Sequence, residues 1–325
     1  MELIQLKPIT IEELTLLQEQ IKNLQNGDCN LSIASLIGRA EEYHIRYALV
    51  EGALVLNWRP YKGASDGWVI PWNHEKIIEI IQALEKDSLE QCQQLVLYGR
   101  FSEITQRIES LMPYRNFVTL SSNSWWDYLY DRENFIKLEG RKFHGKRNFI
   151  KRFYNQHPNA KLLPITVENI PNCREFLDQW YAEQAELSQG LLDESKAIHT
   201  AFDHWEEFRL TGGILVDEEK TLGFTIGSMV SQEIFAIHFE KADRNVIGAY
   251  PTLSVEMAKM IPETVKWLNR EEDLGIAGLR KAKQDWFPSD VIRKTFLKLE
   301  KESEFGSNCK KRTPCSCGCG QQNNF

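Results

Sequence analysis

The 325-residue sequence lacks the features that mark membrane and secreted proteins. It contains no uncharged apolar run approaching the roughly 18 residues that a membrane-spanning helix needs. Its first residues, MELIQLKPITIEEL, show no basic stretch followed by an apolar run, so we expect no secretory signal. These absences predict a cytoplasmic protein.

An excess of basic residues is also absent. Lys and Arg number 39 against 46 Asp and Glu, which gives a net charge of −7. The chain as a whole is therefore no polyanion binder, and any phosphate contact must come from a local basic patch. The 42% hydrophobic and 26% charged residues are ordinary for a globular protein, and the length suits two domains.

Cysteine is sparse in the expected cores. Cys29, Cys92 and Cys173 stand singly and are expected to be reduced thiols. The other four lie in the Gly/Ser/Asn-rich tail, residues 302–325, and lack the Cys-x-x-Cys pairs of a zinc ribbon. Their Cys-x-Cys-x-Cys spacing could bind Cu(I) or Zn, so they are weak metal candidates in a tail that we expect to be disordered: Cys309, Cys315, Cys317 and Cys319.

Hydrophobic periodicity and turn signals predict one order of elements twice: two helices, a three-strand meander, a helix, a strand and a helix. The Glu51-Gly52 pair predicts a hairpin in the first meander. The first copy is predicted at residues 10–25, 32–43, 45–52, 53–58, 67–72, 75–86, 93–99 and 102–112, followed by a strand at 117–120. The second is predicted at 168–184, 195–210, 214–217, 222–230, 233–240, 250–261, 265–269 and 276–283.

This order resembles that of the GNAT acyltransferase fold. The sequence therefore predicts an α+β protein of tandem GNAT-like domains, each a mixed sheet flanked by helices, at residues 1–150 and 151–301. Residues 125–161 belong to neither copy cleanly. In such a sheet we expect a cleft beside the fourth strand, where the next helix begins.

Residues Arg141 to Arg152 hold six Lys and Arg and no acid. Drawn as a helix, Arg141, Lys151 and Arg152 point away from an apolar stripe, but Lys146 falls inside it. A buried unpaired ammonium is costly, so Lys146 should have an anionic partner. The candidates for substrate binding here are Lys142, His144, Lys146, Arg147 and Asn148; the alternative is a solvated basic helix whose lysines snorkel.

The segment HFEKADRNVIGAY, residues 238–250, follows a predicted strand. Alternation along that strand predicts that His238 and Glu240 share one face. The following loop has the spacing of an acyl-CoA pyrophosphate loop, Gln/Arg-x-x-Gly-x-Gly/Ala, but not its end residues, because it reads Asn245-x-x-Gly248-x-Tyr250. A CoA loop is thus degenerate at best. A hydrogen-bonded core histidine is the alternative for His238.

In NREEDLGIAGLRKAK, residues 269–283, the charges are sorted by sign. Acids follow a strand, and Arg280, Lys281 and Lys283 lie on the next helix. This arrangement favours either a pocket for a zwitterion or an internal salt-bridge network. We expect Lys146 and the acids of Arg270–Asp273 to belong to one charged site.

Residues 125–153, 238–250 and 269–283 together resemble a family of mostly uncharacterised bacterial proteins similar to the soluble C-terminal domain of phosphatidylglycerol lysyltransferases. The resemblance covers roughly residues 32–288. It implies a tandem GNAT fold with a charged cleft between the halves and, for the lysyltransferases, aminoacyl transfer from aminoacyl-tRNA to a lipid headgroup. Two departures from the lysyltransferases are expected: these 325 residues contain no segment that we expect to form a membrane domain, and Gln284-Asp285-Trp286 stands where the family usually has Leu-Ser-Tyr/Phe.

The sequence therefore predicts a transferase that moves an aminoacyl group to an amine or hydroxyl acceptor, such as a lipid headgroup or small molecule. The expected base is Glu240 or Glu271, with His238 as alternative, and Lys146 or Arg147 could hold phosphate or the oxyanion. The remaining substrate-binding candidates are Lys241, Arg270, Asp273, Arg280, Lys281 and Lys283.

Two other functions stay open: an acyl-CoA-dependent N-acyltransferase, and a non-catalytic binding module for a small charged ligand. No cofactor is firmly predicted beyond aminoacyl-tRNA or acyl-CoA as donor. The expected partners are a small charged substrate, the acceptor end of aminoacyl-tRNA and, peripherally, lipid.

Overall fold

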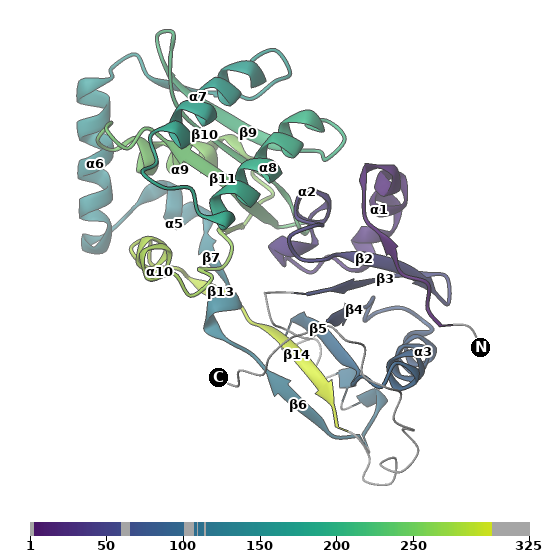
Figure 1. Cartoon of the computed structure of the whole chain (residues 1–325). Coiled ribbons are helices and arrows are strands. Elements are labelled where there is room, and N and C mark those ends of the chain that lie inside the picture. Colours follow the sequence, from purple (N-terminus) through teal and green to yellow (C-terminus); the bar gives the residue numbers. More distant parts are fainter. Residues whose placement is uncertain (1–2, 60–65, 101–106, 109, 114, 301–325) are drawn as a thin grey trace.

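The computed structural model describes residues 3–59, 66–100, 107–108, 110–113 and 115–300. The cysteine tail and most of the helix predicted at 102–112 lie outside these residues. The described chain folds into two seven-stranded sheets, each with helices packed against it (Figure 1). None of its helices is both long and apolar enough to span a bilayer.

The first sheet is built mainly from the N-terminal half. Its helices are α1 (Leu14–Gln20), α2 (Ile33–Gly38) and α3 (Ile77–Glu90), and the predicted Thr10–Glu13 capping box precedes α1. Its strands, in spatial order, are β1 (Lys7–Pro8), β2 (Arg46–Val50), β3 (Ala53–Trp58), β4 (Gly67–Val69), β5 (Val96–Arg100), β14 (Lys294–Leu299) and β6 (Phe117–Leu120).

The second sheet repeats this plan. Its helices are α5 (Arg132–Lys137), α6 (His144–Gln156), α7 (Ile170–Ala182), α8 (Gln189–Asp203), α9 (Ala249–Met260) and α10 (Ala277–Gln284). Its strands, in the order matching the first sheet, are β8 (Lys161–Pro164), β9 (Thr211–Asp217), β10 (Lys220–Met229), β11 (Ile234–Ala242), β12 (Trp267–Asn269), β7 (Asp127–Asp131) and β13 (Asp290–Ile292).

Strand directions also repeat. In each sheet an antiparallel meander, β2–β3–β4 or β9–β10–β11, is followed by one parallel pairing, β4 with β5 or β11 with β12. An antiparallel strand then follows, β14 beside β5 or β7 beside β12. The predicted tandem GNAT-like fold is confirmed.

Two strands are exchanged between the halves. The chain leaves β6 in the first sheet and enters β7 in the second, and it leaves β13 in the second sheet and enters β14 in the first. β14 lies between β5 and β6, and β7 lies between β12 and β13. Sheet membership therefore does not change once at residue 150, because each sheet takes its sixth strand from the other half of the sequence.

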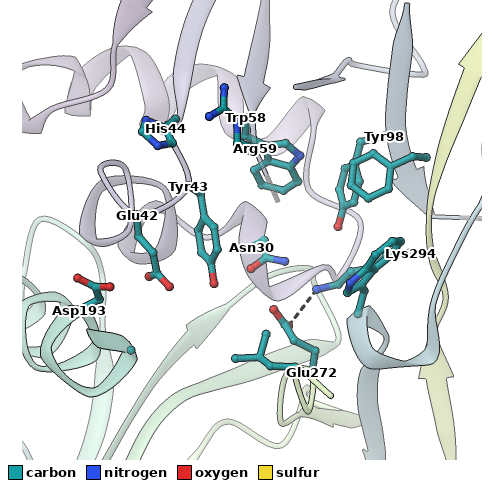
Figure 2. A pocket seen from close by; sticks show the side chains of 14 residues that line it. Asn30, Glu42, Tyr43, His44, Trp58, Arg59, Tyr98, Asp193, Glu272 and Lys294 are labelled. Atoms are coloured by element: carbon teal, nitrogen blue, oxygen red, sulfur yellow. Dashed lines mark hydrogen bonds and ion pairs between the residues drawn. The ribbon is translucent and has the colours of Figure 1, made fainter. Parts of the chain in front are cut away.

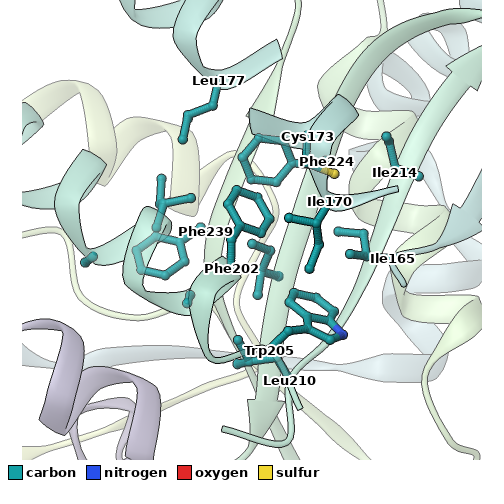
Figure 3. Packing of buried hydrophobic residues seen from close by; sticks show 14 of the residues in the cluster. Ile165, Ile170, Cys173, Leu177, Phe202, Trp205, Leu210, Ile214, Phe224 and Phe239 are labelled. Atoms are coloured by element: carbon teal, nitrogen blue, oxygen red, sulfur yellow. The ribbon is translucent and has the colours of Figure 1, made fainter. Parts of the chain in front are cut away.

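Apolar side chains cover both faces of the second sheet. Helices α7 and α8 pack on one face, where Phe202 of α8 meets Phe224 of β10 with ring centroids 5.5 Å apart (Figure 3). Helices α5 and α9 pack on the opposite face. Ala34 of α2 joins the α7–α8 core, so the first half reaches the second across α8. Each fully buried aromatic side chain here stabilises the fold by about 1.5–3 kcal/mol.

Candidate functional site

The fourth and fifth strands of the second sheet diverge after a short parallel pairing. β11 and β12 pair only over Ile234–Ala236 and Trp267–Asn269. Beyond this point side chains bridge the gap, because Arg270 Nη2 lies 2.9 Å from Glu240 Oε1 and the next residue, Glu271, reaches β11 as well. The gap lies where the GNAT-like fold predicts a cleft.

A β-bulge on β11 changes which side chains share a face. Consecutive residues of β10 pair with Phe239 and Ile237, which leaves His238 as an extra residue. Glu240 turns toward α9, where the Ser254 hydroxyl lies 2.9 Å from both of its carboxylate oxygens. His238 turns the other way, toward β10. The predicted common face of His238 and Glu240 is therefore wrong, because the bulge interrupts the alternation.

His238 is the middle member of a hydrogen-bonded chain. Its Nε2 lies 2.8 Å from the Ser228 hydroxyl on β10, and its Nδ1 lies 2.9 Å from Glu271 Oε1. The imidazole is almost fully buried, whereas the Glu271 side chain is about one-fifth exposed. Two of the predicted catalytic candidates, His238 and Glu271, thus meet, and the third, Glu240, lies on the opposite face of the sheet.

A buried cluster lies where the two halves exchange strands. The ammonium of Lys294, at the start of β14, lies 2.6 Å from Asp127, 3.1 Å from Asp28 and 3.2 Å from Glu272. The Cys29 sulfur lies 3.3 Å from carboxylate oxygens of Asp127 and Glu272. The Lys294 side chain is 2% exposed, so three carboxylates share one buried ammonium.

The pKa values in this cluster diverge. Burial raises the pKa of Asp127 to about 7, although Lys294 opposes the shift. Burial acts in the same direction on Glu272, but Lys294 and several hydrogen bonds lower the pKa of this carboxyl to about 2. Burial lowers the pKa of Lys294 less than the carboxylates raise it, so the ammonium stays charged. The cluster therefore holds one carboxyl whose pKa is raised toward neutrality beside one whose pKa is held well below its usual range.

A pocket of about 570 Å³ opens above this cluster, between the first half and the α8 and β12–α10 segments of the second (Figure 2). Lys294 and Glu272 form part of its wall, and their ion pair is visible in the figure. Aromatic side chains are the largest group in the rest of the wall, which also holds two further acids and the basic side chains of His44 and Arg59. The acids are Glu42, Asp193 and Glu272, and the aromatic residues are Tyr43, Trp58, Tyr98, Trp125 and Phe296.

Comparison with known proteins gives this arrangement a family. The family model described as "Phosphatidylglycerol lysyltransferase, C-terminal" matches residues 21–297. The chain belongs to this family. A comparison with curated proteins finds no match.

Solved structures agree with the family. A conserved protein of unknown function from Bacteroides thetaiotaomicron is 30% identical, with 92% of this chain and 100% of that chain covered and a TM-score of 0.81. The C-terminal domain of a putative lysylphosphatidylglycerol synthetase from Agrobacterium fabrum is 10% identical, with 89% of this chain and 92% of that chain covered and a TM-score of 0.57. L-PGS from Bacillus licheniformis is 12% identical, with 93% of this chain and 96% of that chain covered and a TM-score of 0.59. At such identities the last two show the shared fold.

In this lysyltransferase-family chain the three acids after β12 contact three different partners. Glu271 binds His238 and Glu272 joins the Lys294 cluster, while Asp273 accepts hydrogen bonds from Arg280 at 2.8 and 3.0 Å. These bonds lower the pKa of Asp273 against the effect of burial. On α10, Lys281 pairs with Asp285 and Lys283 donates to the carbonyls of Arg270 and Glu271. Much of the sorted charge is thus an internal network.

Lys146 does not meet those acids. Its ammonium lies 4.6 Å from the ring centroid of Trp286, which stacks on Phe135. Burial and the nearby Arg270 charge lower the pKa of Lys146. No ion pair joins Lys146 to a described carboxylate, so the predicted anionic partner is wrong: the indole face takes its place.

The other basic candidates lie away from the pocket. Helix α6 packs on α9, on the opposite face of the sheet from α8, and its candidates are exposed. Arg147 donates to the carbonyls of Leu138 and Gly140, and His144 contacts Asn148, while Lys142 lies over Phe143. Lys241 is buried beside Glu194 of α8 at 2.6 Å. None of these side chains lines the pocket.

The pocket residues carried little signal in the sequence. Asp28 and Cys29 occupy a short Gly- and Asn-rich turn, and Lys294 begins a strand whose other lysine, Lys298, is ordinary. Glu42, in the turn after α2, and Asp193 of α8 look like solvated surface residues in the sequence. One clue was present: Glu272, which does line the pocket, belongs to the charged stretch predicted to form a site.

Proposed function

We propose that this chain is an aminoacyltransferase that moves an aminoacyl group from a donor such as aminoacyl-tRNA to an amine or hydroxyl acceptor, such as a lipid headgroup or small molecule. The observation that carries the proposal is the acidic and aromatic pocket at the junction of the halves, in a chain of the phosphatidylglycerol lysyltransferase C-terminal family.

The pocket has the chemistry that an aminoacyl group needs. Such a group carries an α-ammonium, and Asp193, which forms no ion pair with a described residue, supplies opposite charge in the pocket. The other two pocket carboxylates, Glu42 and Glu272, are paired with Arg39 and Lys294. Aromatic faces also attract ammonium groups. Trp58 and Tyr98 meet edge to face with centroids 4.6 Å apart, which gives this wall a fixed shape.

The transfer step needs a proton acceptor for the incoming nucleophile. His238 is the best candidate, because Glu271 orients its ring and Glu271 lies directly before the pocket residue Glu272. Glu240 is less suitable, since its carboxylate is occupied by Arg270 and Ser254 on the other face.

Packing at α9 disfavours the acyl-CoA alternative. Gly248 precedes this helix with φ +86°, and a Cβ there would come within 2.2 Å of the Phe149 carbonyl oxygen of α6. The glycine therefore lets α6 approach the start of α9. An acyl-CoA pyrophosphate would need this same helix start to be open.

Transfer is tested with purified protein, lysyl-tRNA and alanyl-tRNA as donors, and phosphatidylglycerol micelles or a free primary amine as acceptors. We expect transfer of the aminoacyl group to one acceptor. Asp193→Asn should raise KM for the donor by about tenfold with little change in kcat, the loss expected for one charge-assisted contact.

Asp203→Asn is the matched control, because Asp203 lies on the same helix but pairs with Arg174 outside the pocket. It should leave KM unchanged. Donor binding without turnover on any acceptor would instead support the binding-module alternative, and an equal effect of the two variants would remove the pocket from the proposal.

A further inference from the structure

Ser228, His238 and Glu271 form a line of hydrogen bonds across three separate segments. Ser228 lies on β10, His238 on β11 and Glu271 directly after β12. The two contacts, 2.8 Å at Nε2 and 2.9 Å at Nδ1, use both ring nitrogens of the histidine. This is the order nucleophile, base and orienting carboxylate that activates a serine hydroxyl in acyl-transfer enzymes.

The backbone departs from regular geometry at two of the three positions. The β-bulge leaves His238 on the face of Ser228 and turns Glu240 to the opposite face, where regular alternation would have kept His238 and Glu240 together. Glu271 adopts φ +60°, a conformation that residues other than glycine seldom take, and its N–H donates to Asn269 Oδ1 at 2.8 Å. Such local strain persists only where surrounding contacts hold it, and it gathers at functional sites.

The carboxylate fixes the proton positions. Ionised Glu271 can only accept, so Nδ1 of His238 carries the hydrogen of that bond. In the neutral ring Nε2 is then an acceptor, and the Ser228 hydroxyl donates to it. A serine in this state transfers its proton to the imidazole as its oxygen attacks.

Glu271 connects this chain of bonds to the pocket, because the next residue, Glu272, forms part of the pocket wall. Ser228 is opposite Ala236, which packs with Cys29, and the Cys29 sulfur is 3.3 Å from the pocket residue Glu272. Ser228 is 6% exposed, so a substrate carbonyl would enter a nearly dry environment. Low water content favours transfer over hydrolysis.

We propose that Ser228 is an acyl-accepting nucleophile for carboxylic esters, with His238 as its base and Glu271 as a positioning residue. Ser228 Oγ bonds to the ester carbonyl carbon while its proton passes to His238 Nε2. The carbon–oxygen bond to the alcohol then breaks, and the departing alcohol takes that proton. The acceptor amine or hydroxyl later attacks the acyl-serine, its proton passes through His238 to Ser228, and the free serine returns.

Acylation of Ser228 rests on the proposed function in one respect only, which is the identity of the natural acyl donor. The test therefore uses 4-nitrophenyl acetate, a small ester that needs no tRNA. The full chain is incubated with it, quenched in acid and digested, and the acetylated peptide is located by mass spectrometry. We expect one acetyl group on Ser228 and release of 4-nitrophenol in an initial burst.

Ser228→Ala should abolish the adduct, and His238→Gln should slow its formation by at least about a hundredfold, the usual contribution of a general base. Thr225→Val is the matched control, because Thr225 is a fully buried hydroxyl residue on the same strand whose hydroxyl has no hydrogen-bond partner among the described residues. It should acetylate at the wild-type rate. Glu271→Gln should keep the adduct but shift the pH profile of its formation.

Wild-type protein without an acetylated Ser228, or a burst that survives in Ser228→Ala, would overturn the proposal. Melting temperatures identify any variant that fails to fold, and the location of the adduct in wild-type protein does not depend on variants. An adduct without aminoacyl transfer would refute the proposed function alone. Aminoacyl transfer that persists in Ser228→Ala would refute the covalent step alone.

Discussion

Replacing Lys294 by methionine should destabilise the protein strongly. The substitution keeps the length of the side chain but leaves three carboxylates, each within 3.2 Å of the lost ammonium, with no cation. Removing one partner of a buried ion pair costs about 3–5 kcal/mol. For a chain of this size we expect the melting temperature to fall on the order of 10 °C.

Lys146→Met is the matched comparison. Lys146 is half-buried and lies on the Trp286 ring, without an ion pair to a described carboxylate. A thioether also packs well on an aromatic face, so the change should cost less than about 1 kcal/mol. Both variants and the wild type are compared by urea unfolding at 25 °C.

The Lys294→Met deficit should also depend on pH. Protonation removes the repulsion among the orphaned carboxylates, so the deficit should be smaller at pH 5 than at pH 8. If both lysine variants lose the same free energy of unfolding, or if the Lys294→Met deficit does not change with pH, the ion-pair reasoning fails.

Three further outcomes follow from the fold and the cluster. Because Asp127 has a pKa of about 7 in the fold and about 4 when unfolded, its own contribution to stability should fall as pH rises from about 4 to 7, so the difference in free energy of unfolding between the wild type and Asp127→Asn should change over this range in urea unfolding. Residues 1–150 and 151–301 produced as separate chains should each lack dispersed amide NMR signals, since each misses a strand that the other supplies; two folded fragments would contradict the exchange. Gly248→Ala should lower the melting temperature more than Gly52→Ala, because both have positive φ but only the first methyl group meets backbone; equal losses would argue against the α6–α9 contact.

Hydrophobic periodicity and turn residues were enough to predict most of the helices and strands. The hairpin at Glu51-Gly52 is confirmed, with Val50 opposite Ala53, because turn chemistry and alternation act over a few residues. The repeated order is confirmed for the same reason, and it led directly to the tandem fold. The strand exchange was not predicted, because β7 is five residues within a segment assigned to neither copy, and its partners are distant in sequence.

The candidate site was predicted only in fragments. His238 and Glu271 were chosen for their residue types, and the structure brings them together, but the bulge that separates His238 from Glu240 depends on pairing with β10. Lys294 and Asp28 meet through tertiary contacts alone. No periodicity in either segment distinguishes them from surface residues, so the cluster could not be found without the fold.

The position of β14 sets an order of events during synthesis. β5 and β6 emerge from the ribosome early, but the strand that belongs between them is almost the last described element to be made. Until then the first sheet has two unpaired inner edges, which are the kind of surface that recruits other strands. The first sheet can therefore close only after β14 has been made, although its other strands are made early.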